Sequence, residues 1–353
     1  MADVTADDLR ASVASGTITE AQAASILTQA QTRAGLRQAE DEPFELFKGF
    51  AEIFVAVGLS ILIAGMAGLA MLFDSFGLVL VFYAVAAWWL ARYFTLKRRM
   101  MLPSIVLVTA YAAATAGIAI WLIGFVAGEI QSGALHSVLI LTATGLGIIA
   151  WYRRFRLPFA MFLLGLAGFG IALALSSNFD SRIYLSGGIS RLFDLRAGSN
   201  LPIGTLIFGL AALAGGLWFD MRDPHRLGRN AAAGFWLHIL AAPALVNTIA
   251  LTFYNMGPGS GYVLLGISLL LVALLALIID RRSFLTAGIG YLIFLIGYVL
   301  TDPSQPASWA LVMFTVGLGL TLLGTFWTDM RGLIMRLLPA FPGKSRLPPY
   351  SME

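Results

Sequence analysis

Apolar and polar residues alternate along the chain in a pattern that predicts membrane-spanning helices. A polar stretch of about 49 residues comes first, and ten apolar segments separated by short polar connections follow. About 20 apolar residues cross a hydrocarbon core of ~30 Å. The pattern therefore predicts an all-α polytopic transmembrane helix bundle of about ten spans. They lie at about 50–73, 78–96, 103–126, 134–152, 157–176, 201–219, 231–254, 262–279, 283–300 and 309–328.

The first 40 residues predict a small cytosolic helical hairpin. Thr5 and Thr19 each begin a capping-box-like sequence, and Gly16 between them is a plausible helix stop. The apolar face of such a hairpin is too small for an independent core, so we expect it to dock on the membrane domain or on a protein partner. Residues 41–49 read as an interfacial linker, residues 50–330 as the membrane domain, and residues 331–353 as a basic, Pro-rich cytosolic tail.

Composition supports a membrane protein and narrows the chemistry. The chain is 59% hydrophobic and 12% charged, whereas soluble domains carry about 25% charged residues. It has no cysteine and three dispersed histidines, which excludes thiolate chemistry and gives no metal site. The net charge of +4 is spread over short clusters between spans, so it indicates topology and not nucleic-acid binding. No cofactor is expected.

The seventh segment holds the candidate polar intramembrane site. His238, Pro243 and Asn247 lie within 24 uncharged residues, 231–254. Polar groups at membrane depth are functional candidates because burying them is unfavourable. The alternative is that they hydrogen-bond neighbouring helices and lock the bundle. No carboxylate is expected near His238, so we expect a neutral imidazole that donates to a backbone carbonyl or a hydroxyl.

Ionisable residues elsewhere are expected near the membrane surfaces. Asp74, Glu129 and Asp302 lie at predicted outer ends, and Glu52 lies at an inner end. The absence of a carboxylate at any predicted midplane disfavours an ion-coupled transporter and paired-acid catalysis. We assign no catalytic residue.

Charge asymmetry between connections predicts the orientation. Lys and Arg gather in alternate connections and in the tail, and such clusters face the cytoplasm. Both termini are therefore expected inside. The loop 177–200, with Arg182, Arg191 and Arg196, is the exception, because it is expected outside. Its apolar residues near position 190 fit a short amphipathic helix on the outer surface, with a solvated linker as the alternative.

Two repeated features have two interpretations each. Similar helix ends occur at 218–222, 280–282 and 327–331, and they indicate either duplicated hairpins or Trp/Arg anchors at the inner interface. Glycine pairs seven residues apart indicate close helix packing, with a substrate path as the alternative. The pairs are Gly58/Gly65, Gly117/Gly124, Gly290/Gly297 and Gly317/Gly324.

The sequence Gly16-Thr17-Ile18-Thr19-Glu20-Ala21-Gln22 resembles the G-x-I-[ST]-x-x-Q turn of an N-terminal hairpin in a family of bacterial multi-pass membrane proteins. The block Phe235 to Pro243 is similar to a stretch that recurs in proteobacterial membrane proteins. This resemblance implies a bacterial inner-membrane location and no particular activity.

We therefore expect an inner-membrane scaffold, sensor or assembly factor that is not an enzyme. Its expected partners are the lipid bilayer and a protein bound through residues 1–40. One alternative is a transporter for a small organic or lipidic solute, with two inverted halves of five helices. A second alternative is an intramembrane enzyme, disfavoured because His238 has no partner visible in the sequence. The sequence does not identify a substrate.

Overall fold

The described residues form helices joined by turns and irregular segments. A computed structural model describes residues 4–33, 49–70, 76–127, 133–176, 190–226, 229–300, 308–348 and 350, and these contain no strand. Seven of the described helices are long and apolar enough to cross a membrane, and three shorter apolar helices accompany them. The prediction of an all-α helix bundle is confirmed for the described residues, and the length and composition of these helices support a membrane protein.

The two N-terminal helices begin at the predicted capping sequences. α1 (Ala6–Ala14) starts at a capping box in which Thr5 and Asp8 bond each other's backbone N–H, and α2 (Glu20–Arg33) follows Thr19, whose hydroxyl accepts from Gln22. The Thr5 side chain and backbone hold the pKa of Asp8 below its usual value. The cap is therefore intact at neutral pH and is lost as the pH falls through that lowered pKa. Gly16 takes a positive φ of 74° between the two helices, which suits glycine.

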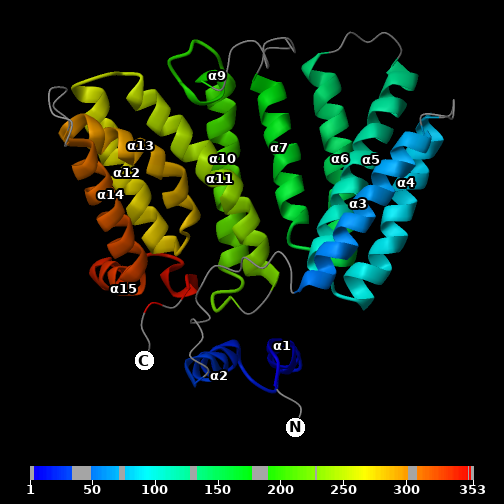
Figure 1. The fold of residues 1–353 in the computed structure, drawn as a ribbon, viewed down its shortest axis with the longest axis horizontal. Coiled ribbons are helices and arrows are strands. Elements are labelled where there is room, and N and C mark those ends of the chain that lie inside the picture. The colour runs from blue at the N-terminus through cyan, green and yellow to red at the C-terminus, as the bar shows by residue number, and fades with distance from the viewer. Residues whose placement is uncertain are drawn as a thin grey trace. The chain divides into compact units, whose positions relative to one another are not determined.

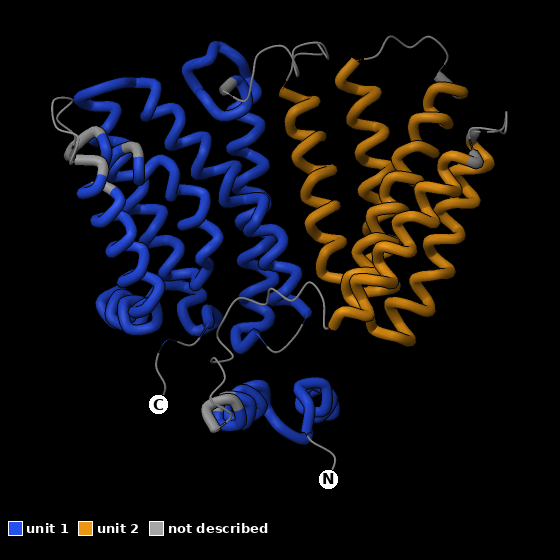
Figure 2. The backbone as a smooth tube through the Cα atoms, in the orientation of Figure 1, with its two compact units in different colours: residues 1–43, 189–353 blue, residues 44–188 orange. Residues whose placement is uncertain are grey.

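The chain divides into two compact units, one of residues 44–188 and one of residues 1–43 and 189–353 (Figure 2). The division agrees with the predicted separation of the first five apolar segments from the last five. The unit of residues 44–188 contains α3 (Phe50–Ala70), α4 (Phe76–Ala91), a π-helical turn (Arg92–Lys97), α5 (Met101–Ala127), α6 (Ala134–Phe155) and α7 (Ala160–Ser176).

An aromatic cluster fills the core of the unit 44–188. Trp88, Tyr111, Trp151 and Phe155 have ring centroids 4.5–5.7 Å apart, and alanines such as Ala160 let the helices approach. Glu52, predicted at an inner helix end near the membrane surface, has a buried side chain. Its Oε2 accepts from the first two N–H groups of α5, at 3.0 and 3.2 Å. A carboxylate is favoured there because a helix N-terminus leaves these donors without intrahelical partners.

The unit that includes residues 189–353 is organised around one central helix, α11 (Figure 1). α11 packs along α10 and also contacts α12, α13 and α9. The elements are α9 (Ser190–Phe193), α10 (Leu201–Asp220), α11 (Arg229–Tyr254), α12 (Ser260–Ile279), α13 (Ser283–Leu300), α14 (Ser308–Thr325), α15 (Trp327–Leu337) and a 3₁₀ turn (Lys344–Arg346). The boundary predicted at 330/331 is wrong, because α15 runs through it and its Arg331 and Met335 are buried.

The predicted glycine pairs do not all mediate packing. A Cβ atom at Gly117 would lie 2.9 Å from Leu80, as expected for a close contact. At Gly58, Gly65, Gly290 and Gly317 a Cβ atom would meet nothing within 4 Å, and these glycines are exposed. Spacing alone places two residues on one helix stripe but does not say whether that stripe faces a neighbour.

Candidate functional site

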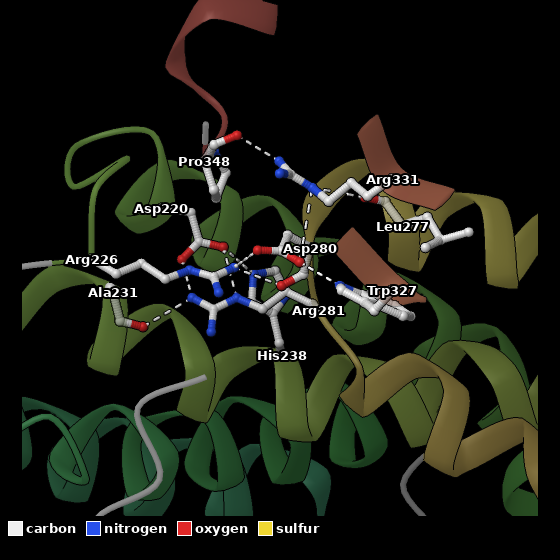
Figure 3. A network of polar contacts seen from close by, with 10 residues as sticks. All are labelled: Asp220, Arg226, Ala231, His238, Leu277, Asp280, Arg281, Trp327, Arg331 and Pro348. Atoms are coloured by element: carbon white, nitrogen blue, oxygen red, sulfur yellow. Dashed lines mark hydrogen bonds and ion pairs between the residues drawn. The ribbon is translucent and has the colours of Figure 1, made fainter. Parts of the chain in front are cut away.

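A buried ion pair with a histidine joins α10, α11 and the α12–α13 turn. His238 Nε2 lies 2.8 Å from Asp220 Oδ2, and Arg281 donates from Nε to Oδ2 at 3.1 Å and from Nη2 to Oδ1 at 2.5 Å (Figure 3). His238 and Arg281 are fully buried and Asp220 is 3% exposed. An ionised carboxylate only accepts hydrogen bonds, so Nε2 of a neutral His238 carries its hydrogen.

Two glycines make room for this contact, one on each helix. A Cβ atom at Gly216 of α10 would lie 2.7 Å from the His238 ring. A Cβ atom at Gly234 of α11 would lie 2.5 Å from Asp220 Oδ1 and 3.0 Å from the Gly216 carbonyl. Each glycine therefore stands one turn before the polar residue of its own helix and opposite the polar residue of the other. Small residues at these places allow α10 and α11 to pack closely enough for the bond.

A second carboxylate, Asp280, contacts residues of α15 and of the α10–α11 connection. It occupies the C-cap of α12 with a left-handed φ of 57°, a conformation that Asp tolerates better than most residues. Its Oδ1 accepts from Trp327 Nε1 at 2.6 Å and lies 3.8 Å from Arg331 Nε. Its Oδ2 pairs with Arg226 Nη2 at 3.0 Å. Asp280 thus links the α10–α11 connection to α15.

The arginines also satisfy backbone carbonyls at these helix ends. Arg281 Nη2 donates to Ala231 O at 3.0 Å, and Arg226 Nη2 donates to Asp280 O at 2.6 Å. Arg331 donates to Leu277 O at 3.1 Å and to Pro348 O at 2.5 Å. Leu277 and Asp280 lie in the last turn and at the C-cap of α12, where backbone carbonyls have no intrahelical donor, so Arg331 and Arg226 complete them. We call the ten residues drawn in Figure 3 the ion network; they are Asp220, Arg226, Ala231, His238, Leu277, Asp280, Arg281, Trp327, Arg331 and Pro348.

Formal charges balance in the ion network when the neighbouring Asp223 is included. Its three guanidinium groups face the carboxylates of Asp220 and Asp280, and a third buried carboxylate, Asp223, accepts from the Ala231 N–H at 3.2 Å. With His238 neutral, three positive and three negative charges cancel. Paired and hydrogen-bonded charges are those that an apolar interior tolerates. All four carboxylate oxygens of Asp220 and Asp280 are engaged in hydrogen bonds or ion pairs. Neither carboxylate is therefore placed to act as a free base.

The expectation that His238 lacks a carboxylate partner is wrong. Asp220 is the last residue of α10, and it was interpreted as part of an inner-surface cluster. α10 and α11 are antiparallel neighbours, so the end of α10 lies beside the first half of α11, where His238 is found (Figure 1). Pro243 and Asn247 are half-buried and lie outside the ion network, and α11 continues through Pro243 without a break.

The outer-loop candidates are partly described. Asp194 and Arg196, just after α9, bind the end of α11: Asp194 Oδ2 accepts from Asn255 Nδ2 at 2.7 Å, and Arg196 Nη1 donates to Asn255 O at 2.6 Å. A short helix, α9, is present where one was predicted, and the residues after it bond the end of α11, which differs from a solvated linker; its place on the outer membrane surface stays a prediction. Arg191 is exposed. Asp74, Glu129, Arg182 and Asp302 lie outside the described residues.

The three similar helix ends found in the sequence come together in the structure, which their similarity did not predict. The segments 218–222, 280–282 and 327–331 each contribute to the ion network, through Asp220, through Asp280 and Arg281, and through Trp327 and Arg331. Trp218 does fit the predicted interface anchor, because it is 46% exposed with Arg222 3.7 Å above its ring. In the other two segments Asp280, Arg281, Trp327 and Arg331 are buried, which an interface anchor does not explain.

Within the described part of the chain, no group of three or more His, Cys, Asp or Glu residues is arranged to hold a metal ion. No family model, curated protein or solved structure matches this chain.

Proposed function

We propose that the protein is a non-catalytic scaffold, sensor or assembly factor of a bacterial inner membrane, with ten spans and both termini in the cytoplasm. Its partner would bind the two N-terminal helices, α1 and α2. The observation that carries the proposal is the ion network. It joins the ends of α10, α11, α12 and α15, and all four oxygens of Asp220 and Asp280 are already engaged. A polar cluster bonded to itself fixes helices relative to one another and leaves no carboxylate oxygen free for substrate or coupling ion.

The N-terminal helices supply the partner surface in this proposal. Leu9 and Ala23 are buried in the small core of the pair, whereas Ile26 is 45% exposed on α2. A groove beside Ile26 is lined by Ile18, Ala21, Gln22 and Ser25. An apolar groove on a short helix pair suits an apolar helix of a protein partner, because such a pair has too little core of its own.

Crosslinking in cells tests this proposal. A photo-crosslinking residue at Ile26 should give one discrete protein adduct, and the same residue at exposed Ser15 should not. Deletion of residues 1–40 should abolish the adduct and leave the membrane units folded. Rapid degradation of the truncated chain would mean that α1 and α2 are structural, and the proposal would lose its basis.

A transporter for a small organic or lipidic solute is the second candidate, favoured by the two units of five apolar helices each. The units differ in packing, however. In residues 44–188 the third apolar helix, α5, contacts α3, α4, α6 and α7, whereas in residues 189–353 the second apolar helix, α11, is central. Inverted repeats would share one pattern. Solute uptake by the purified protein in proteoliposomes would favour this candidate over the scaffold.

An intramembrane enzyme stays third for a new reason. His238 has a carboxylate partner after all, but Arg281 binds the same carboxylate through both oxygens, so Asp220 serves an ion pair as well as the histidine.

A further inference from the structure

α15 presents three different faces along its eleven residues. Trp327, Arg331 and Met335 are buried, and the first two belong to the ion network. Met330, Leu333 and Leu337 are exposed, Leu333 at 61% and Leu337 at 75%. Because residues three and four apart lie on one side of a helix, the exposed three form a continuous apolar stripe.

The third face is polar. Asp329 and Arg336 are exposed and seven residues apart, so they form a second stripe beside the apolar one. A helix on the surface of a soluble protein needs only two faces, one for the core and one for water. An additional exposed apolar stripe requires an apolar environment outside the protein core, in addition to core and water.

The position of α15 supplies that environment. α15 begins two residues after the apolar helix α14 ends at Thr325, and it contacts α12. Figure 1 shows it lying at the ends of α12 and α14 instead of continuing α14. A helix at the end of a membrane-spanning segment lies at the level of the lipid headgroups.

We propose that the apolar stripe of α15, residues Met330, Leu333 and Leu337, lies in the headgroup–acyl boundary of the adjacent leaflet and that the basic side chains around it bind anionic lipid headgroups. Arg282, Arg336 and Arg346 are exposed near or on α15, against one exposed acid on the helix, Asp329. Basic residues at such a boundary attract anionic lipids. Lipid is favoured over a protein as the occupant because exposed apolar residues also line the preceding helix and its end, at Leu318, Leu322 and Phe326. α15 would lie on lipid whether or not residues 1–40 bind a partner.

The absence of cysteine makes a direct test practicable. A nitroxide label on Leu333→Cys and, as matched control, on Asp329→Cys would be measured in the full-length protein in nanodiscs. The Leu333→Cys label should be more accessible to oxygen than to a water-soluble nickel chelate, and the Asp329→Cys label should show the opposite order. Equal accessibility to the chelate at both sites would overturn the proposal. A Leu333→Cys label closed to both reagents would also overturn it, because protein would then cover the stripe.

The headgroup preference has its own measurement. The association of spin-labelled phosphatidylglycerol relative to phosphatidylcholine should fall by up to about fivefold in Arg336→Gln, which corresponds to loss of one basic contact. Asp329→Asn, which removes the nearby acid, should not lower it. An unchanged ratio in Arg336→Gln would show that headgroup charge is not recognised at α15.

Discussion

Replacing Asp220 by asparagine should destabilise the protein by about 3 kcal/mol. Asparagine has nearly the same shape, so the change creates no cavity, but it removes the charge that faces Arg281. At an effective dielectric constant of ~20, two unit charges about 4 Å apart interact by roughly 4 kcal/mol. Removing one partner of a buried pair typically costs about 3–5 kcal/mol, because the other charge stays buried alone. Arg281 is fully buried, so its charge would stay in the interior without its carboxylate partner.

A double-mutant cycle separates the interaction energy between Asp220 and Arg281 from the other effects of each substitution. Arg281→Met should also be strongly destabilising, because it leaves Asp220 with His238 alone. The double variant Asp220→Asn/Arg281→Met should recover at least ~1 kcal/mol relative to the sum of the single changes. Reversible unfolding in mixed micelles, followed by circular dichroism, gives these free energies. Asp329→Asn, an exposed acid, is the matched control and should stay within about 0.5 kcal/mol of wild type. A small effect of Asp220→Asn, or simple additivity in the double variant, would refute this account of the ion network.

Three further predictions concern packing, the histidine and topology. Gly234→Ala should destabilise by about 1–3 kcal/mol, because its methyl group would collide with Asp220, whereas Gly317→Ala, which meets open space, should not; thermal melting in detergent compares them. His238→Gln should retain most of the stability by donating to Asp220, whereas His238→Leu should cost at least about 1 kcal/mol in the same melts, and equal melting of both with wild type would exclude a structural role. A reporter active only outside the cytoplasm should be active when fused after Asn255 and inactive after Arg282, and the reverse pattern would overturn the orientation.

The helices could be predicted from the sequence because hydrophobicity is a local property of each segment. Apolar runs and capping residues such as Thr5 fix where helices begin and end with no knowledge of their neighbours. The partner of His238 could not be predicted in this way. It depends on the axial alignment of α10 against α11, which side chains on both helices determine together. Asp220 was read as an inner-surface residue because it ends an apolar run.

A usable signal was nevertheless present. Gly216 precedes Asp220 by four residues and Gly234 precedes His238 by four, so each polar side chain has a gap one turn before it on the same helix. Two antiparallel helices with that spacing can interlock, the gap of one receiving the polar group of the other. The glycine pairs seven apart were a weaker guide, because they did not involve a polar residue to be accommodated. Pairing glycines with nearby ionisable residues is the more informative pattern.

The wide spacing of the ion network along the chain sets an order for its assembly during synthesis. Asp220 meets His238 after 18 residues, but Arg281 follows Asp220 by 61 residues, and Trp327 follows Asp280 by 47. At roughly 5–20 residues per second, Asp220 waits about 3–12 s for its arginine. His238 is made much sooner, so we expect it to hold the carboxylate in the meantime. Ribosome-bound chains that end before or after Arg281 test this order. Protease resistance of α10 and α11 should appear in the shorter chains and increase in the longer ones. If no resistance appears until α15 is complete, the helix ends assemble only after α15 has been made, and the proposed order is wrong.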